Sequence, residues 1–146
     1  MITLSHVIEH VHDPMKVLES CLKLLKPGGK IWIETPNIHS LGHDRFQKNW
    51  RGLETPRHLV LFNKVSLREA VLNAGFREVN NLNTPSPLLF IFQKIFNMEN
   101  GKSLDELTTW TFGRWINFNL IRFYEQLFQS KREFLKISAF KPEAQI

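Results

Sequence analysis

The spacing of apolar and polar residues predicts a strand, a helix and a second strand in the first quarter of the chain. Residues 2–4 form a short, mainly apolar run, and residues 15–25 carry apolar side chains at helical spacing. Residues 30–34 then predict a second strand, with Ile31 and Ile33 on one face. Two strands joined through a helix pair in parallel by a right-handed crossover, so this pattern predicts an α/β fold.

Capping residues mark both ends of this predicted helix. Asp13 is a suitable N-cap, and Pro14 suits a first helical turn, where no backbone N–H is needed. The sequence Pro27-Gly28-Gly29 then stops the helix and makes the turn into the second strand.

The remaining pattern predicts further elements after one long loop. Residues 38–63 are rich in polar and aromatic side chains without clear periodicity, so we expect a loop with a short helix around 46–50. Ser66 and Glu69 have the spacing of a capping box, and Gly75 ends the helix that they would begin. The other predicted elements are strands at 76–82 and 133–141 and a breaker at 84–87.

Two aromatic-rich segments, 88–98 and 110–128, belong to a predicted helical insertion at about 85–130. Ser103 begins a second capping box, so a helix should run from it to about residue 129. Aromatic residues at helical spacing are most simply explained by packing on the sheet or on a second subunit. The alternatives are a lid over a hydrophobic substrate and an element that contacts a membrane surface.

The composition indicates one globular domain, because 42% of the 146 residues are hydrophobic and only 23% are charged. The net charge of +5 favours an anionic partner or membrane surface, although a solvated surface explains it as well. No basic run alternates with aromatics, as is typical of nucleic-acid-binding proteins, and no apolar stretch has the length of a bilayer span. A single cysteine, Cys21, excludes an internal disulfide, which suits the reducing cytoplasm.

Three motifs together carry a family resemblance. The sequence H-V-I-E-H-V-H-D-P occupies residues 6–14, and L-L-K-P-G-G-K-I-W-I-E-T-P-N occupies residues 24–37. A third run, from Phe46 to Phe62, reads F-x-x-x-W-x-x-L-E-x-P-R-H-L-x-x-F. In this combination the chain resembles the class I S-adenosylmethionine-dependent methyltransferases, and most of all the branch of the ubiquinone-biosynthesis type.

The resemblance implies the C-terminal half of a Rossmann-like methyltransferase sheet, with its last strand antiparallel. Met1 stands about where the family's fourth strand begins, so the chain would hold the fourth, fifth, seventh and sixth strands. The family's Gly-rich cofactor loop and its ribose-binding acidic residue belong to the first half, and neither is present here. We therefore expect one partial domain over residues 1–146, whose open sheet edge leads to a homo-oligomer or accepts a missing N-terminal half.

By resemblance, Leu4, Ser5 and His6 lie against the cofactor, S-adenosylmethionine, and Glu9 and His10 are the catalytic residues. Methyl transfer from a sulfonium needs a positioned nucleophile and a base for its proton, and histidine is the side chain whose ordinary pKa suits such a base. The alternative is that Glu9 and His10 brace the loop through hydrogen bonds to the backbone.

The third motif supplies the residues that we expect at the substrate. Trp50 would form an aromatic wall, and Arg57 would bind a carboxylate or phosphate through paired hydrogen bonds, with His58 beside it. The alternatives are a surface salt bridge and an anchor for the loop.

A metal site is the remaining interpretation of the first motif. His6, Glu9 and His10 have the H-x-x-E-H spacing that places two histidines on one helical face in a group of zinc proteases. Here the motif follows a strand and precedes Asp13-Pro14, which disfavours a protease. The ubiquinone-biosynthesis O-methyltransferases carry E-x-x-E-H at this place and can hold a divalent metal; because His6 replaces the first Glu, we predict no metal.

The sequence therefore leaves three hypotheses. The first is methyl transfer to an O, N or C nucleophile on a small molecule or glycan, incomplete in this chain without the Gly-rich loop. The second is a non-catalytic remnant or assembly module that keeps half of the methyltransferase fold. The third is a metal hydrolase, which requires tight zinc binding by His6, Glu9 and His10.

Overall fold

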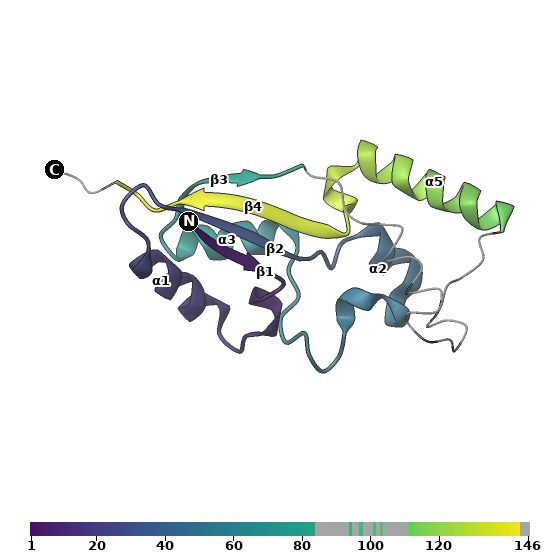
Figure 1. The fold of residues 1–146 in the computed structure, drawn as a ribbon, viewed down its shortest axis with the longest axis horizontal. Helices are drawn as coiled ribbons and strands as arrows, with labels where there is room; N and C mark the ends of the chain where they lie inside the picture. The colour runs from purple at the N-terminus through teal and green to yellow at the C-terminus, as the bar shows by residue number, and fades with distance from the viewer. Residues whose placement is uncertain (84–93, 95–96, 98–100, 102, 104–110, 144–146) are drawn as a thin grey trace.

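The computed structural model describes residues 1–83, 94, 97, 101, 103 and 111–143, and its centre is a four-stranded sheet (Figure 1). The strands are β1 (Ile2–Ser5), β2 (Lys30–Pro36), β3 (Arg77–Asn81) and β4 (Phe134–Phe140), in the order β1-β2-β4-β3. β1 runs parallel to β2, and β4 is antiparallel to both of its neighbours. The predicted α/β class, the strand order and the antiparallel last strand are confirmed.

One face of this sheet carries the main hydrophobic core. Leu4 of β1 pairs with Ile33 of β2, and Ile33 pairs with Ile137 of β4, so three apolar side chains stand in one row. Helices α1 (Pro14–Leu24) and α3 (Lys64–Asn73) cover this face, as Figure 1 shows, and bury Leu18 and Leu67 completely. This packing fixes the strand ends from which the site residues project.

The ends of α1 follow the capping residues seen in the sequence. The backbone N–H of Lys16 donates to Oδ1 of Asp13 over 3.0 Å, so Asp13 is the N-cap as predicted. Gly28 lies at φ 68°, in the left-handed region that glycine tolerates best, and its N–H donates to the Lys141 carbonyl over 3.1 Å. The Pro-Gly-Gly turn therefore also joins the end of β4.

Helix α3 begins earlier than predicted. Its N-cap is Asn63, whose side chain accepts hydrogen bonds from the backbone N–H groups of Val65 and Ser66. Ser66 is the third helical residue, and its hydroxyl accepts in return from the N–H of Asn63 over 3.0 Å. The predicted box with Ser66 as N-cap and Glu69 as its partner is therefore wrong by one turn.

The long loop after β2 contains short helices rather than one helix at 46–50. Helix α2 (Leu41–Phe46) is followed by two 3-10 turns, η2 (Gln47–Asn49) and η3 (Arg51–Leu53), and a further turn, η1 (Ile8–His10), follows β1. Ser40 caps α2 by accepting from the His43 N–H. Phe46 and Trp50 form a second, smaller hydrophobic cluster under this loop.

Helix α5 (Phe112–Leu127) and the turn η4 (Gln129–Lys131) precede β4. Of the helix predicted from Ser103 to about residue 129, Ser103 itself is described and not helical, residues 104–110 lie outside the described residues, and α5 begins at Phe112. The breaker at 84–87 and most of the apolar segment 88–98 also lie outside the described residues. Most large side chains of α5 are exposed, so packing of its aromatic residues on the sheet is not what the structure shows. Among the described helices, none combines the length and apolarity needed to cross a membrane.

Candidate active site

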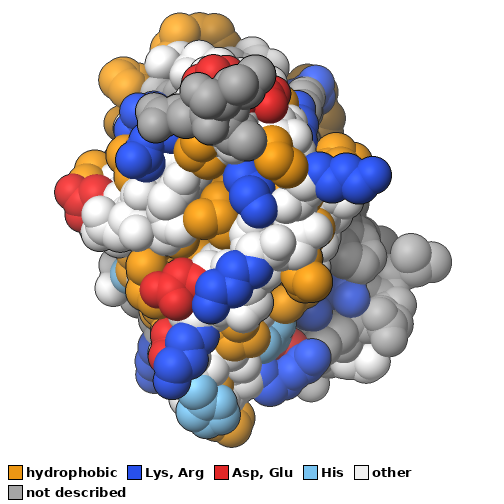
Figure 2. All heavy atoms as spheres, turned by 90° about the vertical axis from the view of Figure 1, so that its left-hand side faces the viewer, with side chains coloured by type: hydrophobic (Ala, Val, Ile, Leu, Met, Phe, Trp, Pro, Cys, Tyr) orange, Lys and Arg blue, Asp and Glu red, His pale blue; other side chains and the backbone are white. Residues whose placement is uncertain are grey.

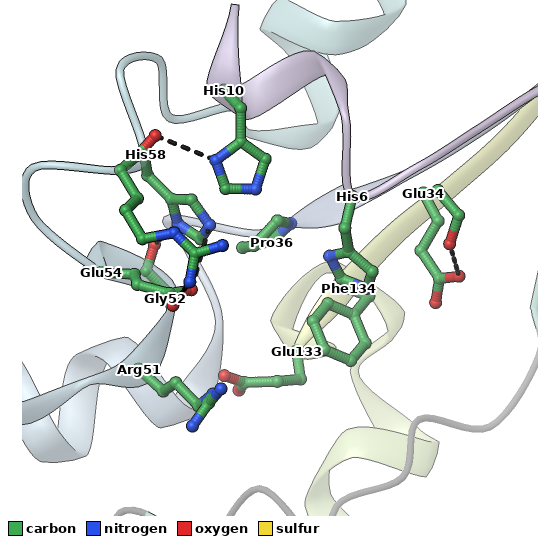
Figure 3. A pocket seen from close by; sticks show the side chains of 12 residues that line it. His6, His10, Glu34, Pro36, Arg51, Gly52, Glu54, His58, Glu133 and Phe134 are labelled. Atoms are coloured by element: carbon green, nitrogen blue, oxygen red, sulfur yellow. Dashed lines mark hydrogen bonds and ion pairs between the residues drawn. The ribbon is translucent and has the colours of Figure 1, made fainter.

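A cavity of about 570 Å³ opens at the carboxyl ends of β1 and β2 (Figure 3). In open α/β sheets, this is the edge at which ligands bind. Four segments of the chain line it: the end of β1, the end of β2, the loop around η3 and the start of β4. The lining residues are Ser5, His6, His10, Glu34, Pro36, Arg51, Gly52, Glu54, Arg57, His58, Glu133 and Phe134.

His6 occupies a strained position at the end of β1. Its φ of 52° is uncommon for a residue with a side chain, and its N–H still donates to the Glu34 carbonyl over 2.9 Å. The imidazole Nδ1 lies 3.1 Å from Oε1 of Glu9, and the ring meets the edge of Phe134 with centroids 4.9 Å apart. The hydrogen bond to Glu9 raises the pKa of His6 above 6.5, against the effect of its partial burial.

Glu9 is completely buried and does not line the cavity. Its Oε1 contacts His6, its Oε2 accepts the Thr35 hydroxyl over 3.0 Å, and its carbonyl accepts from the N–H groups of Leu59 and Val60. Burial raises the pKa of Glu9, but the hydrogen bonds from His6, its own backbone and Thr35 outweigh it and lower the pKa. These contacts are those of a residue that braces the loop.

His10 and His58 both line the cavity, and each ring has its Nδ1 atom beside a backbone carbonyl. Nδ1 of His10 lies 2.9 Å from the Arg57 carbonyl, and Nδ1 of His58 lies 2.7 Å from the Gly52 carbonyl. A carbonyl only accepts, so both Nδ1 atoms must carry protons, and each Nε2 keeps a lone pair in the neutral ring. The rings are 4.6 Å apart, and His10 is therefore both braced by the backbone and able to accept a proton.

Two arginines reach the cavity from the loop around η3. Arg57 donates to Oε1 of Glu54 over 2.8 Å, and 70% of its side chain is exposed, so it is already engaged in a surface salt bridge. Arg51 also lines the cavity and makes no ion pair with any described carboxylate. The structure thus adds Arg51 as an anion-binding candidate that the sequence motif did not single out.

Trp50 lies behind the cavity rather than in its wall. Its side chain is only 1% exposed, and its indole N–H donates to Oε1 of Glu133. Leu4 is also part of the core and does not line the cavity. Neither residue therefore lines this cavity, where we expected their side chains to contact a ligand.

Glu133 is a buried carboxyl that sequence reasoning missed. Burial raises its pKa to about 7, against the hydrogen bonds of Trp50, Ser40 and the Gly42 amide. Its Oε2 is buried without a hydrogen bond of good geometry and lies so close to Gly42 that a Cβ there would collide with it. A side chain at residue 42 would therefore require the Glu133 carboxyl to move away from its present position.

The E-T-P-N motif at the end of β2 has a structural reason at each polar position. Glu34 pairs with Lys136 on the neighbouring strand at 3.1 Å and accepts the Ser5 hydroxyl at 3.4 Å. Asn37 is buried, and its amide donates to the carbonyls of Ser130 and Arg132. The motif thus links both strand ends to the segment that begins β4. The motif was visible in the sequence, but the sequence alone assigned no role to Glu34 or Asn37.

Metal-binding groups in the described residues converge on Glu9, His10 and His58, whose ligand atoms lie within 4.8 Å of one another. Both histidines donate Nδ1–H to carbonyls, which is a common support for metal-bound imidazole. Both Glu9 oxygens are, however, already hydrogen-bonded. His6 precedes η1 instead of sharing a helical face with His10, so the zinc-protease arrangement is not formed.

Comparison with known proteins tests the family assignment. A family model described as a methyltransferase domain matches residues 1–81, which is more than half of the chain. The chain belongs to this methyltransferase family. Members of the class use S-adenosylmethionine, and a structurally similar phosphoethanolamine N-methyltransferase from Haemonchus contortus was solved with that molecule bound.

This methyltransferase chain covers only part of the length of each relative. The ubiquinone biosynthesis O-methyltransferase of Vibrio cholerae is 46% identical over 37 residues, which are 25% of this chain and 15% of the relative. A methyltransferase from Archaeoglobus fulgidus superposes on 95% of this chain with a TM-score of 0.53 and 22% identity, and 57% of its own length is covered. A possible histamine N-methyltransferase from Thermotoga maritima gives a TM-score of 0.53, 18% identity, 95% coverage of this chain and 54% of its own. The chain thus spans about half of such structures.

Proposed function

We propose that this methyltransferase chain takes part in methyl transfer from S-adenosylmethionine to an O, N or C nucleophile on a small molecule or glycan. When bound, the cofactor would supply a methyl group on a sulfonium, and the neutral thioether of S-adenosylhomocysteine would be the leaving group. The observation that carries the proposal is the His10 imidazole at the strand ends, which has its tautomer fixed by the Arg57 carbonyl and an Nε2 free to accept the proton.

The cavity residues take distinct roles in this proposal. Ser5 and His6, at the end of β1, hold the cofactor. The cavity there is lined by the polar side chain of Ser5 and by the rings of His6 and Phe134, which suits the amino-acid part of S-adenosylmethionine. Glu9 positions His6 and does not touch the substrate. His58 and the two arginines orient the methyl acceptor, with Arg51 replacing Trp50 among the substrate-binding candidates.

The cofactor site needs a Gly-rich loop that these residues do not provide. We propose that a further segment or a second chain supplies it along the exposed edge of β1, since β1 has one paired neighbour in the described sheet. We also propose a cytoplasmic location, on the evidence of one buried free cysteine.

Calorimetric titration of the purified chain with S-adenosylhomocysteine tests the proposal, with the mass in solution measured in parallel. Binding at micromolar affinity, together with an oligomer, supports a site completed by a second chain. If a folded chain binds no cofactor at any concentration, the catalytic proposal is rejected for this chain. The alternative, a non-catalytic assembly module, then gains support from a stable oligomer.

A further inference from the structure

Helix α5 exposes a continuous apolar face. Trp115 is 56% exposed, Phe123 is 60% exposed and Leu127 is 61% exposed, although large apolar side chains are usually buried. The other exposed apolar residues of the helix are Phe112, Ile116, Leu120 and Tyr124. An exposed set of this size on one helix indicates an interaction surface.

These residues recur at steps of three and four, which places them on one side of a helix. The other side contacts the protein, where Phe118 packs against the cluster of Phe46 and Trp50. Figure 1 shows α5 beyond the end of the sheet, away from α1 and α3. The exposed apolar face of α5 is therefore separate from the hydrophobic core that α1 and α3 form with the sheet.

The opposite end of the molecule has a different surface. Figure 2 shows hydrophobic side chains there interspersed with basic and acidic ones. On the helices that cover the sheet, α1 and α3, exposed large hydrophobic residues are single positions, Leu24 and Val65. Single residues of this kind are normal on soluble proteins, so the face of α5 needs its own explanation.

We propose that this face of α5 docks on the surface of an anionic lipid bilayer. Phe, Leu and Ile enter the acyl boundary, and the amphipathic rings of Trp115 and Tyr124 suit the headgroup level. Arg122 is exposed beside Trp115 on the rim of the face, where a guanidinium reaches lipid phosphates. The net charge of +5 adds long-range attraction to the same surface.

A second copy of the helix fits this face less well. Helix pairs of a stable seam use aliphatic knobs and oppositely charged flanking residues. Here four of the seven exposed apolar residues are aromatic, and the polar neighbours within the face, Asn119 and Gln126, are neutral amides. Among the described side chains of this face, Arg122 on the rim is the charged one, and two like charges from two copies would not hold a partner helix in one orientation by attraction.

Co-sedimentation of the full chain with vesicles tests the proposal. One vesicle set contains phosphatidylcholine alone, and the other contains phosphatidylglycerol as well. We expect binding to the anionic set that weakens as salt rises, because added salt screens the attraction. Trp115→Ser with Phe123→Ser should reduce this binding by at least about tenfold, since both side chains lose apolar burial in the lipid.

The matched control is Leu24→Ser with Val65→Ser, which removes exposed apolar residues from other helices and should leave vesicle binding unchanged. Arg122→Gln should weaken binding to the anionic set alone. Sedimentation velocity and circular dichroism confirm that each variant is folded and report its mass. The proposal is overturned if wild-type chain ignores both vesicle sets, if control and α5 variants lose binding equally, or if the α5 variants only dissociate a dimer.

Discussion

Trp50 and Glu133, 83 residues apart in the sequence, are joined by a hydrogen bond in the interior, from the indole N–H to the carboxyl Oε1. The bond ties the loop that forms one wall of the cavity to the segment that begins β4. Gly42 closes the other side of the carboxyl and leaves no room for a Cβ. A charged carboxylate in this position is costly, because burial is only partly offset by hydrogen bonds.

Replacing Glu133 by Gln should stabilise the protein at alkaline pH. The folded-state pKa of about 7 exceeds the ordinary value of 4.5, so the folded state holds a proton that the unfolded state releases between these values. Wild-type stability therefore falls as pH rises from 4.5 to 7 and stays low above it. The full cost is about 3 kcal/mol, and Gln, which still accepts from Trp50, should recover about 1–3 kcal/mol at pH 8.

Urea denaturation of both proteins at pH 5 and pH 8 measures this difference. Glu19→Gln, at an exposed position, is the control and should shift stability equally little at both pH values. A Glu133→Gln protein that is less stable than wild type at pH 8 would show that the carboxylate has a compensating partner.

The start of α3 offers a second test. Asn63→Ala removes the side chain that accepts from two backbone N–H groups, and it should lower the free energy of unfolding by about 1 kcal/mol. Ser66→Ala retains Asn63 and should cost less, while Glu69→Ala should cost little. Thermal unfolding of the three variants ranks them, and a larger loss at Ser66 than at Asn63 would restore the helix start predicted from sequence.

The same helix shows why local patterns predict elements better than their ends. The spacing of apolar residues was sufficient to predict β1, α1 and β2. Each of these elements buries one face, and the buried face leaves a periodic pattern of apolar residues in the sequence. Asn63 and Ser66 are both good N-cap residues, however, and only the extended backbone at Asn63 decides between them. Sequence spacing does not contain that angle.

The sequence predicted cavity residues that belong to a recognisable motif. It did not predict residues whose place depends on contacts between distant parts of the chain. Ser5, His6, His10, Arg57 and His58, which the motifs singled out, all line one cavity, and the roles that the resemblance implies for them stay predictions. Glu133 was missed because its importance depends on a contact with Trp50 across most of the chain. The burial of Trp50 was not predictable for the same reason, since an aromatic residue in a loop motif can face a ligand or the interior.

The pair of His6 and Glu9 should make stability depend on pH near neutrality. Because Glu9 raises the pKa of His6 in the folded state, this contribution is complete below 6.5 and is lost as pH rises through the raised value. Glu9→Gln should return the His6 pKa towards 6.5 and remove this slope. The imidazole is 41% exposed, so solvent screening keeps the effect below about 1 kcal/mol. Proton NMR titration of the His6 ring measures the pKa, and an unchanged value in Glu9→Gln would refute the coupling.

His10→Asn separates a catalytic role from a bracing role. Asparagine can still donate to the Arg57 carbonyl, but it has no ring nitrogen to accept a proton. In an assembly that binds cofactor and methylates an acceptor, we expect the rate of S-adenosylhomocysteine formation to fall by about a hundredfold or more, with cofactor affinity unchanged. His12→Asn, at an exposed position outside the cavity, is the matched control and should keep the wild-type rate. If His10→Asn keeps its rate, or loses rate and cofactor affinity together, then His10 only braces the loop and the proton acceptor must be another group.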